Sequence, residues 1–449
     1  MSQIIDCSQR IEANWNWNTT TFISQAYKNN DQFQEFGLKW CGSGFTYITT
    51  PKWINSKYKS LDSYDISLFC GPAVIIDFPN KSKVDSDHVE KELQKIDNIN
   101  EIKICIISTK HSKNFTTKDF NYWKNSPLLD LSLIDTLKKF KIKHLVLDFN
   151  CESIISKRTD DKINFINPNE NFKIQLLEND IVLTENFVSN NNKNTSYYIG
   201  LPISIPNGST SPTRPILIND WFKRKGKIID VATPLFNHWR WKLDIWENNF
   251  DDYLGQPRNE TNFIFSGHGF NHCDAPIHMN RDGKTIQELP NEGLDIFINE
   301  ANLIDMSEYE LPFKVTKEII ESKIKDFDKK NLIILRSDLT NKVGYESREW
   351  HLKSPSIELE AANWIVDNKF KSVCLDFPQD FIAREMPDRM VYNEEFEIHH
   401  KIFDNGITFI EDLMNLGEIA NNTTQICAIP LKMDCLDGAP MRTVAIDWF

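Results

Sequence analysis

The sequence repeats itself over almost its whole length, and this repeat limits the architectures open to the chain. Ile4-Ile5-Asp6 recurs as Ile228-Ile229-Asp230 at an offset of 224 residues, and Lys143–Phe149 recurs as Lys371–Phe377 at an offset of 228. Further matches keep the same order: Trp15-Asn-Trp17 with Trp239-Arg-Trp241, Gly44-Phe45 with Gly269-Phe270, and Asp220-Trp221-Phe222 with Asp447-Trp448-Phe449. Chance matches between apolar strands would not keep one order at a nearly constant offset, so we interpret the pattern as a tandem duplication.

The duplication predicts two domains, residues 1–222 and residues 223–449. A basic connector, Lys223–Lys227, follows the first copy, and we interpret it as a solvated linker. Two copies of one fold in a single chain are expected to pack as an intrachain pseudo-dimer, because fusion preserves the isologous interface of a homodimer. Further homo-oligomerisation is left open.

Charge and composition exclude several classes of function. The chain has 51 Lys and Arg against 64 Asp and Glu, and the net charge of −13 disfavours binding to nucleic-acid phosphates. No apolar run approaches the roughly 18 to 20 residues that cross a bilayer, and the first residues lack the pattern of a leader peptide. The nine cysteines show no paired metal-ligand spacing, which favours buried thiols. We therefore expect a cytoplasmic protein without a nucleic-acid or membrane partner.

Both halves have the pattern of an α/β fold. Short β-branched runs predict buried strands at residues 102–107, 145–147, 332–335 and 373–375. A helix is predicted over Ser354–Ile365, because Ser354 is a suitable N-cap, Pro355 suits the first helical position, and acidic residues follow in the first turn.

Histidine marks where chemistry is expected. Within His268-Gly-Phe-Asn-His272-Cys-Asp274-Ala-Pro-Ile-His278, groups able to bind a metal stand at i, i+4, i+6 and i+10. Imidazole and carboxylate are ligands of zinc and manganese. The alternative is a polar loop whose histidines serve only as hydrogen-bonding groups.

The first copy lacks these ligands. At an offset of 225 the corresponding residues are Ser43, Tyr47, Thr49 and Trp53, while neighbouring Gly44, Phe45 and Pro51 remain. The spacing predicts that residues 1–222 are a degenerate copy that has lost its metal.

The motif from His268 to His278 resembles the signature His-x-Gly-Thr-His-x-Asp-x-Pro-x-His of the cyclase-like metal-dependent hydrolases. That family includes bacterial kynurenine formamidase, isatin hydrolase and trans-dienelactone hydrolase. The resemblance continues through Leu335-Arg-Ser337, Asp376, His399 to Glu411, and Asp437-Gly-Ala-Pro-Met-Arg442. Phe270 and Asn271 depart from the signature, where the family has Gly and Thr. The resemblance implies tandem domains of the swivelling β/β/α type.

The resemblance also implies a metal site and its ligands. A centre of one or two divalent ions, zinc or manganese, would be held by His268, His272, Asp274, His278, His399 and Glu411. His399 is preferred to His400 because it lies twelve residues before Glu411. In the first copy Lys173 falls opposite His399, and Glu185 alone keeps a ligand type.

The implied reaction is hydrolysis of an amide or lactone bond in a small, cyclic or aryl substrate by metal-activated water. His278 or His399 would carry the proton to the leaving group. Substrate contacts are expected from Trp239, Trp241, Phe270 and Trp53, with Trp15 and Trp17 as further candidates from the first copy. Core packing is the alternative for these aromatic residues.

Two other functions stay open on the sequence. A metal-dependent cyclase or lyase acting on a polyketide-like metabolite would use the same site to stabilise an enolate. A non-catalytic metal-binding protein is the third interpretation.

Overall fold

The fold consists of two units, and each unit is built from three separate segments of the chain. The computed structural model describes residues 2–14, 18–79, 81–115, 122, 125–151, 169–241, 243–251, 257–324, 328–434 and 437–449. Unit 1 comprises Met1–Thr20, Trp40–Arg224 and Ile245–Phe263, and unit 2 comprises Thr21–Lys39, Lys225–Asp244 and Ile264–Phe449. Each unit therefore includes a short segment from the other half of the sequence, which comparison of the two halves does not reveal. The predicted division at residue 222 and the pairing of the two halves stay predictions.

Unit 1 is built on a nine-stranded sheet with a parallel centre. β5 (Cys70–Asp77), β7 (Ile104–Ser108), β9 (His144–Leu147) and β10 (Val182–Glu185) run parallel. Antiparallel strands flank them, in the order β1-β13-β11 on one side and β4-β12 on the other. These strands are β1 (Ile4–Asp6), β13 (Ile216–Ile218), β11 (Thr195–Ile199), β4 (Tyr47–Thr49) and β12 (Thr210–Pro212). The predicted strands at residues 102–107 and 145–147 correspond to β7 and β9.

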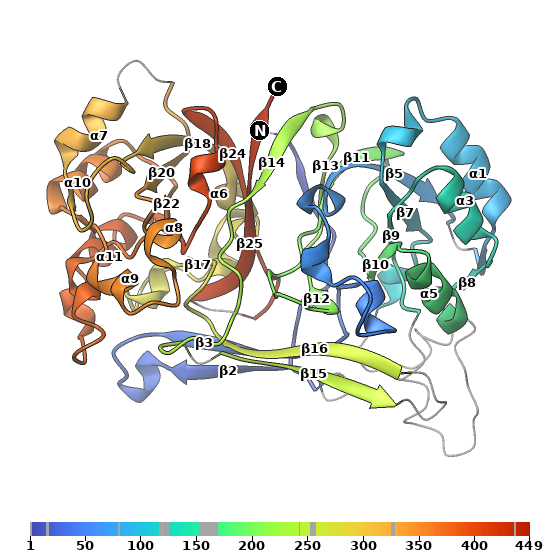
Figure 1. The fold of residues 1–449 in the computed structure, drawn as a ribbon, viewed down its shortest axis with the longest axis horizontal. Coiled ribbons are helices and arrows are strands. Elements are labelled where there is room, and N and C mark those ends of the chain that lie inside the picture. The colour runs from blue at the N-terminus through green and yellow to red at the C-terminus, as the bar shows by residue number, and fades with distance from the viewer. Residues whose placement is uncertain are drawn as a thin grey trace. The chain divides into compact units, whose positions relative to one another are not determined.

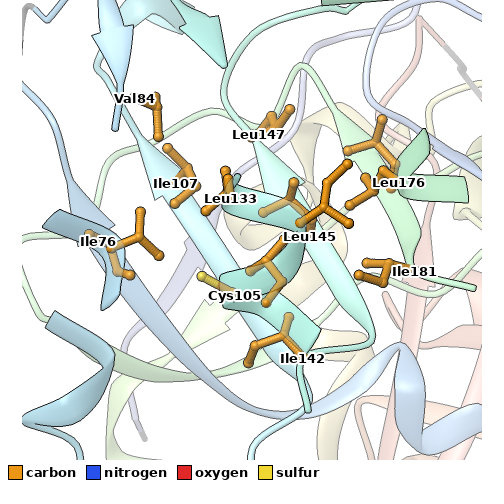
Figure 2. Close-up of a cluster of buried hydrophobic side chains, with 14 of the residues drawn as sticks. Ile76, Val84, Cys105, Ile107, Leu133, Ile142, Leu145, Leu147, Leu176 and Ile181 are labelled. Atoms are coloured by element: carbon orange, nitrogen blue, oxygen red, sulfur yellow. The ribbon is translucent and has the colours of Figure 1, made fainter. Parts of the chain in front are cut away.

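Three helices pack against this parallel centre: α1 (Ser86–Gln94), α3 (Leu133–Lys139) and α5 (Asn169–Glu178). Figure 2 shows the resulting core, in which Cys105 and Leu145 from the strands contact Leu133 and Leu176 from the helices. Nearly continuous apolar strands are expected in a parallel sheet, where side chains are buried on both faces. Two short strands, β6 (Lys83–Val84) and β8 (Leu128–Leu129), pair beside this core.

Unit 2 has an eight-stranded sheet in the order β14-β25-β17-β23-β22-β20-β18-β24. β24, the last strand of this order, also pairs with β25, the second, so the strands from β25 to β24 form a closed series with β14 outside it. The strands are β14 (Gly226–Asp230), β25 (Gly438–Trp448), β17 (His272–Asp274), β23 (Thr408–Glu411), β22 (Ser372–Leu375), β20 (Leu332–Arg336), β18 (Ile298–Asp305) and β24 (Thr423–Pro430). The predicted strands at residues 332–335 and 373–375 correspond to β20 and β22, and the predicted α/β class is confirmed.

Helices cover one face of the unit 2 sheet. Figure 1 shows α7 (Lys317–Lys323), α10 (Leu359–Asp367) and α11 (Glu397–Phe403) beside β18, β20 and β22. Shorter helices, α6 (Leu294–Phe297), α8 (Leu339–Val343) and α9 (Glu349–Leu352), connect the strands. Among the described residues, no helix is both long and apolar enough to cross a membrane.

The predicted start of the helix at Ser354 is wrong. α10 begins at Leu359 after Glu358, and Ser356–Ile357 instead forms β21, which pairs with β19 (Lys314–Val315). The Ser354 hydroxyl donates to the carbonyl oxygen of Pro378 at 2.7 Å and does not cap a helix. Residues 356–357 therefore pair with a distant strand instead of forming the first helical turn that the local sequence predicted.

The two units repeat the same strand register. Tyr47 stands opposite Glu185 between β4 and β10, and His272 stands opposite Glu411 between β17 and β23. The partly buried Asp6–Arg214 ion pair of unit 1 has its counterpart in the Asp230–Arg442 pair of unit 2. The offset inferred from sequence is thus also the offset between equivalent places in the two folds.

Each unit takes strands from the segment it receives from the other half. β2 (Thr20–Gln25), the short helix η1 (Tyr27–Asn29) and most of β3 (Glu35–Cys41) belong to unit 2. Most of β15 (Leu243–Asp251) and of β16 (Pro257–Ser266) belongs to unit 1.

Candidate metal centre

The histidine motif begins with a tight turn that only certain residues can form. Gly269 has φ of 115° and Phe270 has φ of 54°. A Cβ on Gly269 would lie 2.6 Å from the ring of Trp241, so the turn and the close ring both require glycine there. The amide of Phe270 donates to the Tyr345 hydroxyl at 2.7 Å, which holds the turn in place. The departures from the family signature thus belong to a well-anchored turn.

After this turn, strand pairing positions the next ligands. β17 places His272 and Asp274 on the same face of the sheet, because alternate residues of a strand point the same way. Pairing with β23 sets Glu411 opposite His272. The short helix η8 (Pro276–His278) then turns His278 back toward the strand.

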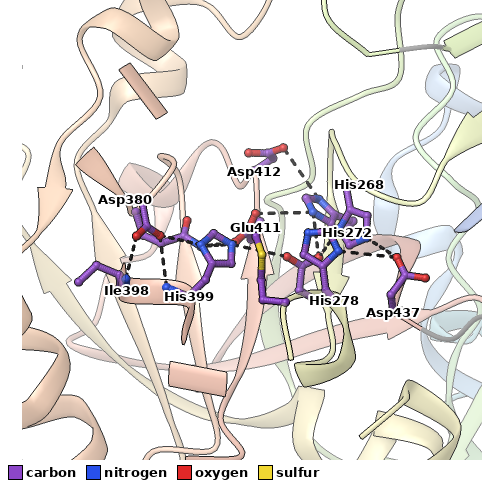
Figure 3. Close-up of polar contacts among 12 residues, drawn as sticks. His268, His272, His278, Asp380, Ile398, His399, Glu411, Asp412 and Asp437 are labelled. Atoms are coloured by element: carbon purple, nitrogen blue, oxygen red, sulfur yellow. Dashed lines mark hydrogen bonds and ion pairs between the residues drawn. The ribbon is translucent and has the colours of Figure 1, made fainter. Parts of the chain in front are cut away.

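Two groups of ligand-capable side chains result, and they share Asp274. One group is His268, Asp274 and His278, and the other is His272, Asp274 and Glu411; within each group one ligand atom per residue lies within 4.8 Å of the others. Asp274 Oδ1 lies 2.8 Å from His268 Nδ1 and 3.1 Å from His272 Nε2. Figure 3 shows His268, His272, His278 and Glu411 close together at this place.

His399 reaches the same place from α11. Its Nε2 lies 3.7 Å from Glu411 Oε1 and 4.0 Å from Asp274 Oδ2. The side chain of Gln379 lies between the two residues, with its Nε2 2.9 Å from His399 Nε2 and 2.6 Å from Glu411 Oε1. The structure therefore brings all six predicted ligands together, and their role as ligands stays a prediction.

Hydrogen bonds fix which nitrogen of three histidines faces the centre. The Nδ1 of His272 donates to the carbonyl oxygen of Phe270 at 2.8 Å, and that of His278 donates to the carbonyl oxygen of Gln34 at 2.8 Å. The Nδ1 of His399 donates to Asp380 Oδ2 at 2.6 Å. In the neutral ring the lone pair is therefore on Nε2, which is how outer hydrogen bonds orient metal-binding imidazoles.

Buried carboxyl groups crowd around these imidazoles. Burial and the charge of Asp274 raise the pKa of Glu411, and burial raises the pKa of Asp412 to about 7. Burial by itself would lower the pKa of His272, but the charges of Asp274 and Glu411 outweigh it and raise that pKa to about 9. Asp437 Oδ2 lies 2.5 Å from His268 Nε2, while its buried Oδ1 has no hydrogen-bond partner among the described residues.

These residues fit a divalent cation. The donor set combines oriented imidazoles with carboxylates that repel one another, and a cation among them would offset that repulsion. Imidazole and carboxylate together suit zinc and manganese, so the chemistry of the donors does not choose between the two metals.

Four residues of this centre escape prediction from the ligand pattern: Gln379, Asp380, Asp412 and Asp437. Asp412 directly follows Glu411, and Asp437 belongs to a segment that carries the family resemblance, so adjacency to a motif is the available signal for these two. No spacing rule indicates Gln379 or Asp380, because they reach His399 through a loop between β22 and α11.

A cavity of about 210 Å³ opens at this centre. Besides the ligand candidates, large aromatic and sulfur-containing side chains line it, namely Phe33, Trp241, Met279, Trp350, Met386 and Phe396. Trp241 is thus the one predicted substrate contact among the described residues that line the cavity.

The other predicted substrate contacts lie elsewhere. Trp239 is about half exposed, and Phe270 is fully buried against Phe236. Trp53 is buried in unit 1, where its ring contacts the ammonium group of Lys173. Trp15 and Trp17 fall outside the described residues. A substrate-binding role for these side chains stays a prediction.

A segment from the first half of the sequence completes the cavity of unit 2. Gln25, Phe33 and Glu35 line it. The Tyr27 hydroxyl donates to the carbonyl oxygen of His278 at 2.8 Å, in addition to the bond between His278 and Gln34. This segment therefore fixes both the backbone and the ring of His278.

Comparison with known proteins identifies relatives. The profile of the Cyclase family, described as "Putative cyclase", matches residues 5–150 and 202–379. The kynurenine formamidase of Bacillus cereus is 24% identical over 224 residues, which cover 48% of this chain and 95% of that enzyme. The kynurenine formamidase of Bacillus anthracis is 24% identical over 229 residues, covering 49% of this chain and 98% of that enzyme.

Solved structures that match the chain also cover about half of it. Isatin hydrolase A from Labrenzia aggregata has 21% sequence identity and a TM-score of 0.42, with 49% of this chain and 94% of that chain covered. A predicted metal-dependent hydrolase from Bacillus stearothermophilus has 21% identity and a TM-score of 0.38, with 50% and 99% covered.

Proposed function

Since the chain belongs to the Cyclase family, we propose that unit 2 is a metal-dependent hydrolase that opens an amide or lactone bond of a small cyclic or aryl substrate. The family predicted from the histidine motif is thereby confirmed. The observation that carries the proposed reaction is that two groups of candidate ligands share Asp274, which lines a cavity. Similarity to kynurenine formamidases supports an amide as the bond that is cleaved.

The proposed centre holds one or two zinc or manganese ions. His268, His272, Asp274, His399 and Glu411 would hold them, with His278 as a sixth candidate. When bound, a divalent ion polarises a carbonyl group and lowers the pKa of a coordinated water to about 7. Asp380 and the carbonyl oxygen of Phe270 keep His399 and His272 turned with Nε2 toward the centre.

We assign His278 to proton transfer and His399 to metal binding. His399 lies within 4.0 Å of both Asp274 and Glu411, the two acids of the second ligand group. The ring of His278 stacks on that of His268, with the ring centroids 3.7 Å apart. The Nδ1 of His278 donates to the carbonyl oxygen of Gln34. Burial lowers the pKa of His278, so its Nε2 keeps a lone pair that can accept a proton from the attacking water and then pass it to the leaving nitrogen or oxygen.

Residues 1–222 are proposed to be the degenerate copy, which holds no metal. The positions equivalent to His268, His272, Asp274 and His278 carry Ser43, Tyr47, Thr49 and Trp53, and the matching register of β4 and β10 supports this alignment. A retained fold without a centre of its own would serve as a scaffold.

The test is hydrolysis of a panel of aryl formamides and lactones before and after chelation. We expect activity that is lost with the metal and returns when zinc or manganese is added back. Activity indifferent to chelation would contradict the proposal. Product mass separates hydrolysis, which adds one water, from the cyclase or lyase reaction, which adds none.

A further inference from the structure

The cavity of unit 2 contains an arginine that serves neither ligand group. Arg240 lies in the loop before β15 and lines the cavity together with Trp241 and the ligand candidates. Its guanidinium stacks on the Trp241 ring, with Cζ 4.7 Å from the ring centroid. Its Nε is buried and has no hydrogen-bond partner within the described part of the chain.

The acidic groups nearest to Arg240 are engaged elsewhere. Glu35 and Asp412 attract the positive charge of Arg240 from a distance. The hydrogen bonds of these two acids go to other residues: Glu35 accepts from the Ser24 hydroxyl at 3.0 Å, and Asp412 accepts from the Tyr345 hydroxyl at 2.6 Å. Neither acid forms an ion pair with Arg240 among the residues that the structure describes. The cation is thus attracted into the cavity without being neutralised by a direct partner.

The two histidines beside Arg240, His351 and His238, do not add positive charge at neutral pH. Burial and the charge of Arg240 lower the pKa of His351, another cavity residue, to about 3. Burial also lowers the pKa of His238, whose Nε2 lies 3.0 Å from the carbonyl oxygen of Tyr345. Of the described residues that line the cavity, Arg240 is the one lysine or arginine.

A guanidinium in this situation is suited to an anion. Burying part of a cation costs free energy unless a partner compensates, and here no side chain of the described residues forms an ion pair with Arg240. The planar fork of an arginine matches a carboxylate with two parallel hydrogen bonds, and the stacked Trp241 ring offers an aromatic surface beside it.

We propose that Arg240 binds the carboxylate of an anionic aryl substrate whose amide or lactone carbonyl lies at the centre around Asp274. This inference rests on the proposed function and narrows its substrate class. Arg240 acts as a specificity-determining residue that contacts the part of the substrate remote from the bond that is cleaved. Trp241 packs on the aryl ring of the substrate, and the six ligand candidates lie at the carbonyl group that is attacked.

The kinetic test compares substrates that differ by one carboxylate. These are formanilide and the formamidobenzoates with the carboxylate ortho, meta or para to the formamide. In the metal-loaded enzyme we expect kcat/KM to favour at least one formamidobenzoate by roughly 10- to 100-fold, the range of a charge-assisted hydrogen-bonded pair. Arg240→Gln should abolish this ratio, and Arg240→Lys should keep part of it. Arg348→Gln, at an exposed arginine that does not line the cavity, should leave the ratio unchanged.

Ligand binding separates this inference from the proposed reaction. Calorimetry with the three aminobenzoates and with aniline needs no turnover, and the tighter binding of an aminobenzoate should depend on Arg240 in the same way. An Arg240-dependent preference without any hydrolysis would support the anion site and contradict the hydrolase. Equal carboxylate preference in the parent enzyme and Arg240→Gln, or no preference in the parent, would overturn the anion site even if formanilide is hydrolysed.

Discussion

Lys173 Nζ lies 2.7 Å from Glu185 Oε2 in unit 1, and both side chains are completely buried. These residues stand where unit 2 has His399 and Glu411. The ammonium group also lies 3.3 Å from the Tyr47 hydroxyl and 4.4 Å from the centroid of the Trp53 ring. The backbone amide of Cys151 donates to the other oxygen of Glu185 at 2.6 Å. In unit 1 the ammonium group of Lys173 thus compensates the charge of Glu185. The equivalent carboxylate of unit 2, Glu411, is instead a candidate metal ligand.

The Lys173–Glu185 pair predicts a strong dependence of stability on charge balance. Lys173→Met leaves a buried carboxylate uncompensated and should lower the free energy of unfolding by about 3 to 5 kcal/mol. The double variant Lys173→Met/Glu185→Leu removes both charges and should recover most of that loss. Urea denaturation measures both effects. Lys314→Met, in an exposed pair with Glu358, should change stability by less than about 1 kcal/mol. A double variant as unstable as the single one would contradict this account.

Metal content should depend on unit 2 only. Asp274→Asn removes the carboxylate that both ligand groups share, and elemental analysis of the purified protein should show most of the metal lost. Thr49→Val, at the equivalent position of unit 1, keeps the shape of the side chain and should leave the metal content unchanged. Metal that survives Asp274→Asn but disappears with Thr49→Val would reverse the assignment.

The two catalytic candidates should separate by metal content. His278→Ala should reduce kcat for an aryl formamide by about 100-fold or more while the metal stays bound, as expected on loss of a general acid or base. His399→Ala should lose both metal and activity, because its Nε2 lies within 4.0 Å of both Asp274 and Glu411. Steady-state kinetics and elemental analysis on the same preparations test this assignment. Loss of metal in both variants would make His278 a ligand as well.

Acid should weaken unit 1 through a buried histidine. Burial lowers the pKa of His144 to about 4; its Nδ1 donates to the carbonyl oxygen of Leu68 at 3.0 Å, and its Nε2 accepts from the Thr184 hydroxyl at 2.7 Å. Between pH 6.5 and 4 the unfolded chain binds a proton that the folded chain does not bind, so stability falls as pH falls. The shift corresponds to about 3 kcal/mol, at 1.36 kcal/mol for each pKa unit.

Urea denaturation across this pH range measures the effect. His144→Gln removes the titrating ring and should show a smaller loss of stability between pH 6.5 and 4 than the parent protein. His88 is only partly buried, with its ring against Phe78, and His88→Gln serves as the control that should follow the parent curve. An unchanged pH dependence in His144→Gln would show that other groups account for the acid sensitivity.

The sequence by itself determined the features that depend on residues close together or on the repeat. Apolar runs indicated β7, β9, β20 and β22, because a buried strand needs only a few adjacent β-branched residues. The offset between copies identified the equivalence of Tyr47 with His272 and of Glu185 with Glu411. The spacing from His268 to His278 selected four ligand candidates, since a short turn and strand keep them together.

Only the tertiary structure decided the features that depend on contacts between distant residues. Pairing with β19 shifted the start of α10 to Leu359, against a local signal at Ser354. Gln34 and Tyr27 reach His278 because residues 21–39 join unit 2, and no local pattern encodes that exchange. Asp380 orients His399, and Arg240 lines the cavity, through loops whose paths are set by packing. Local sequence fixes which side chains are available, whereas long-range packing fixes which of them face the same cavity.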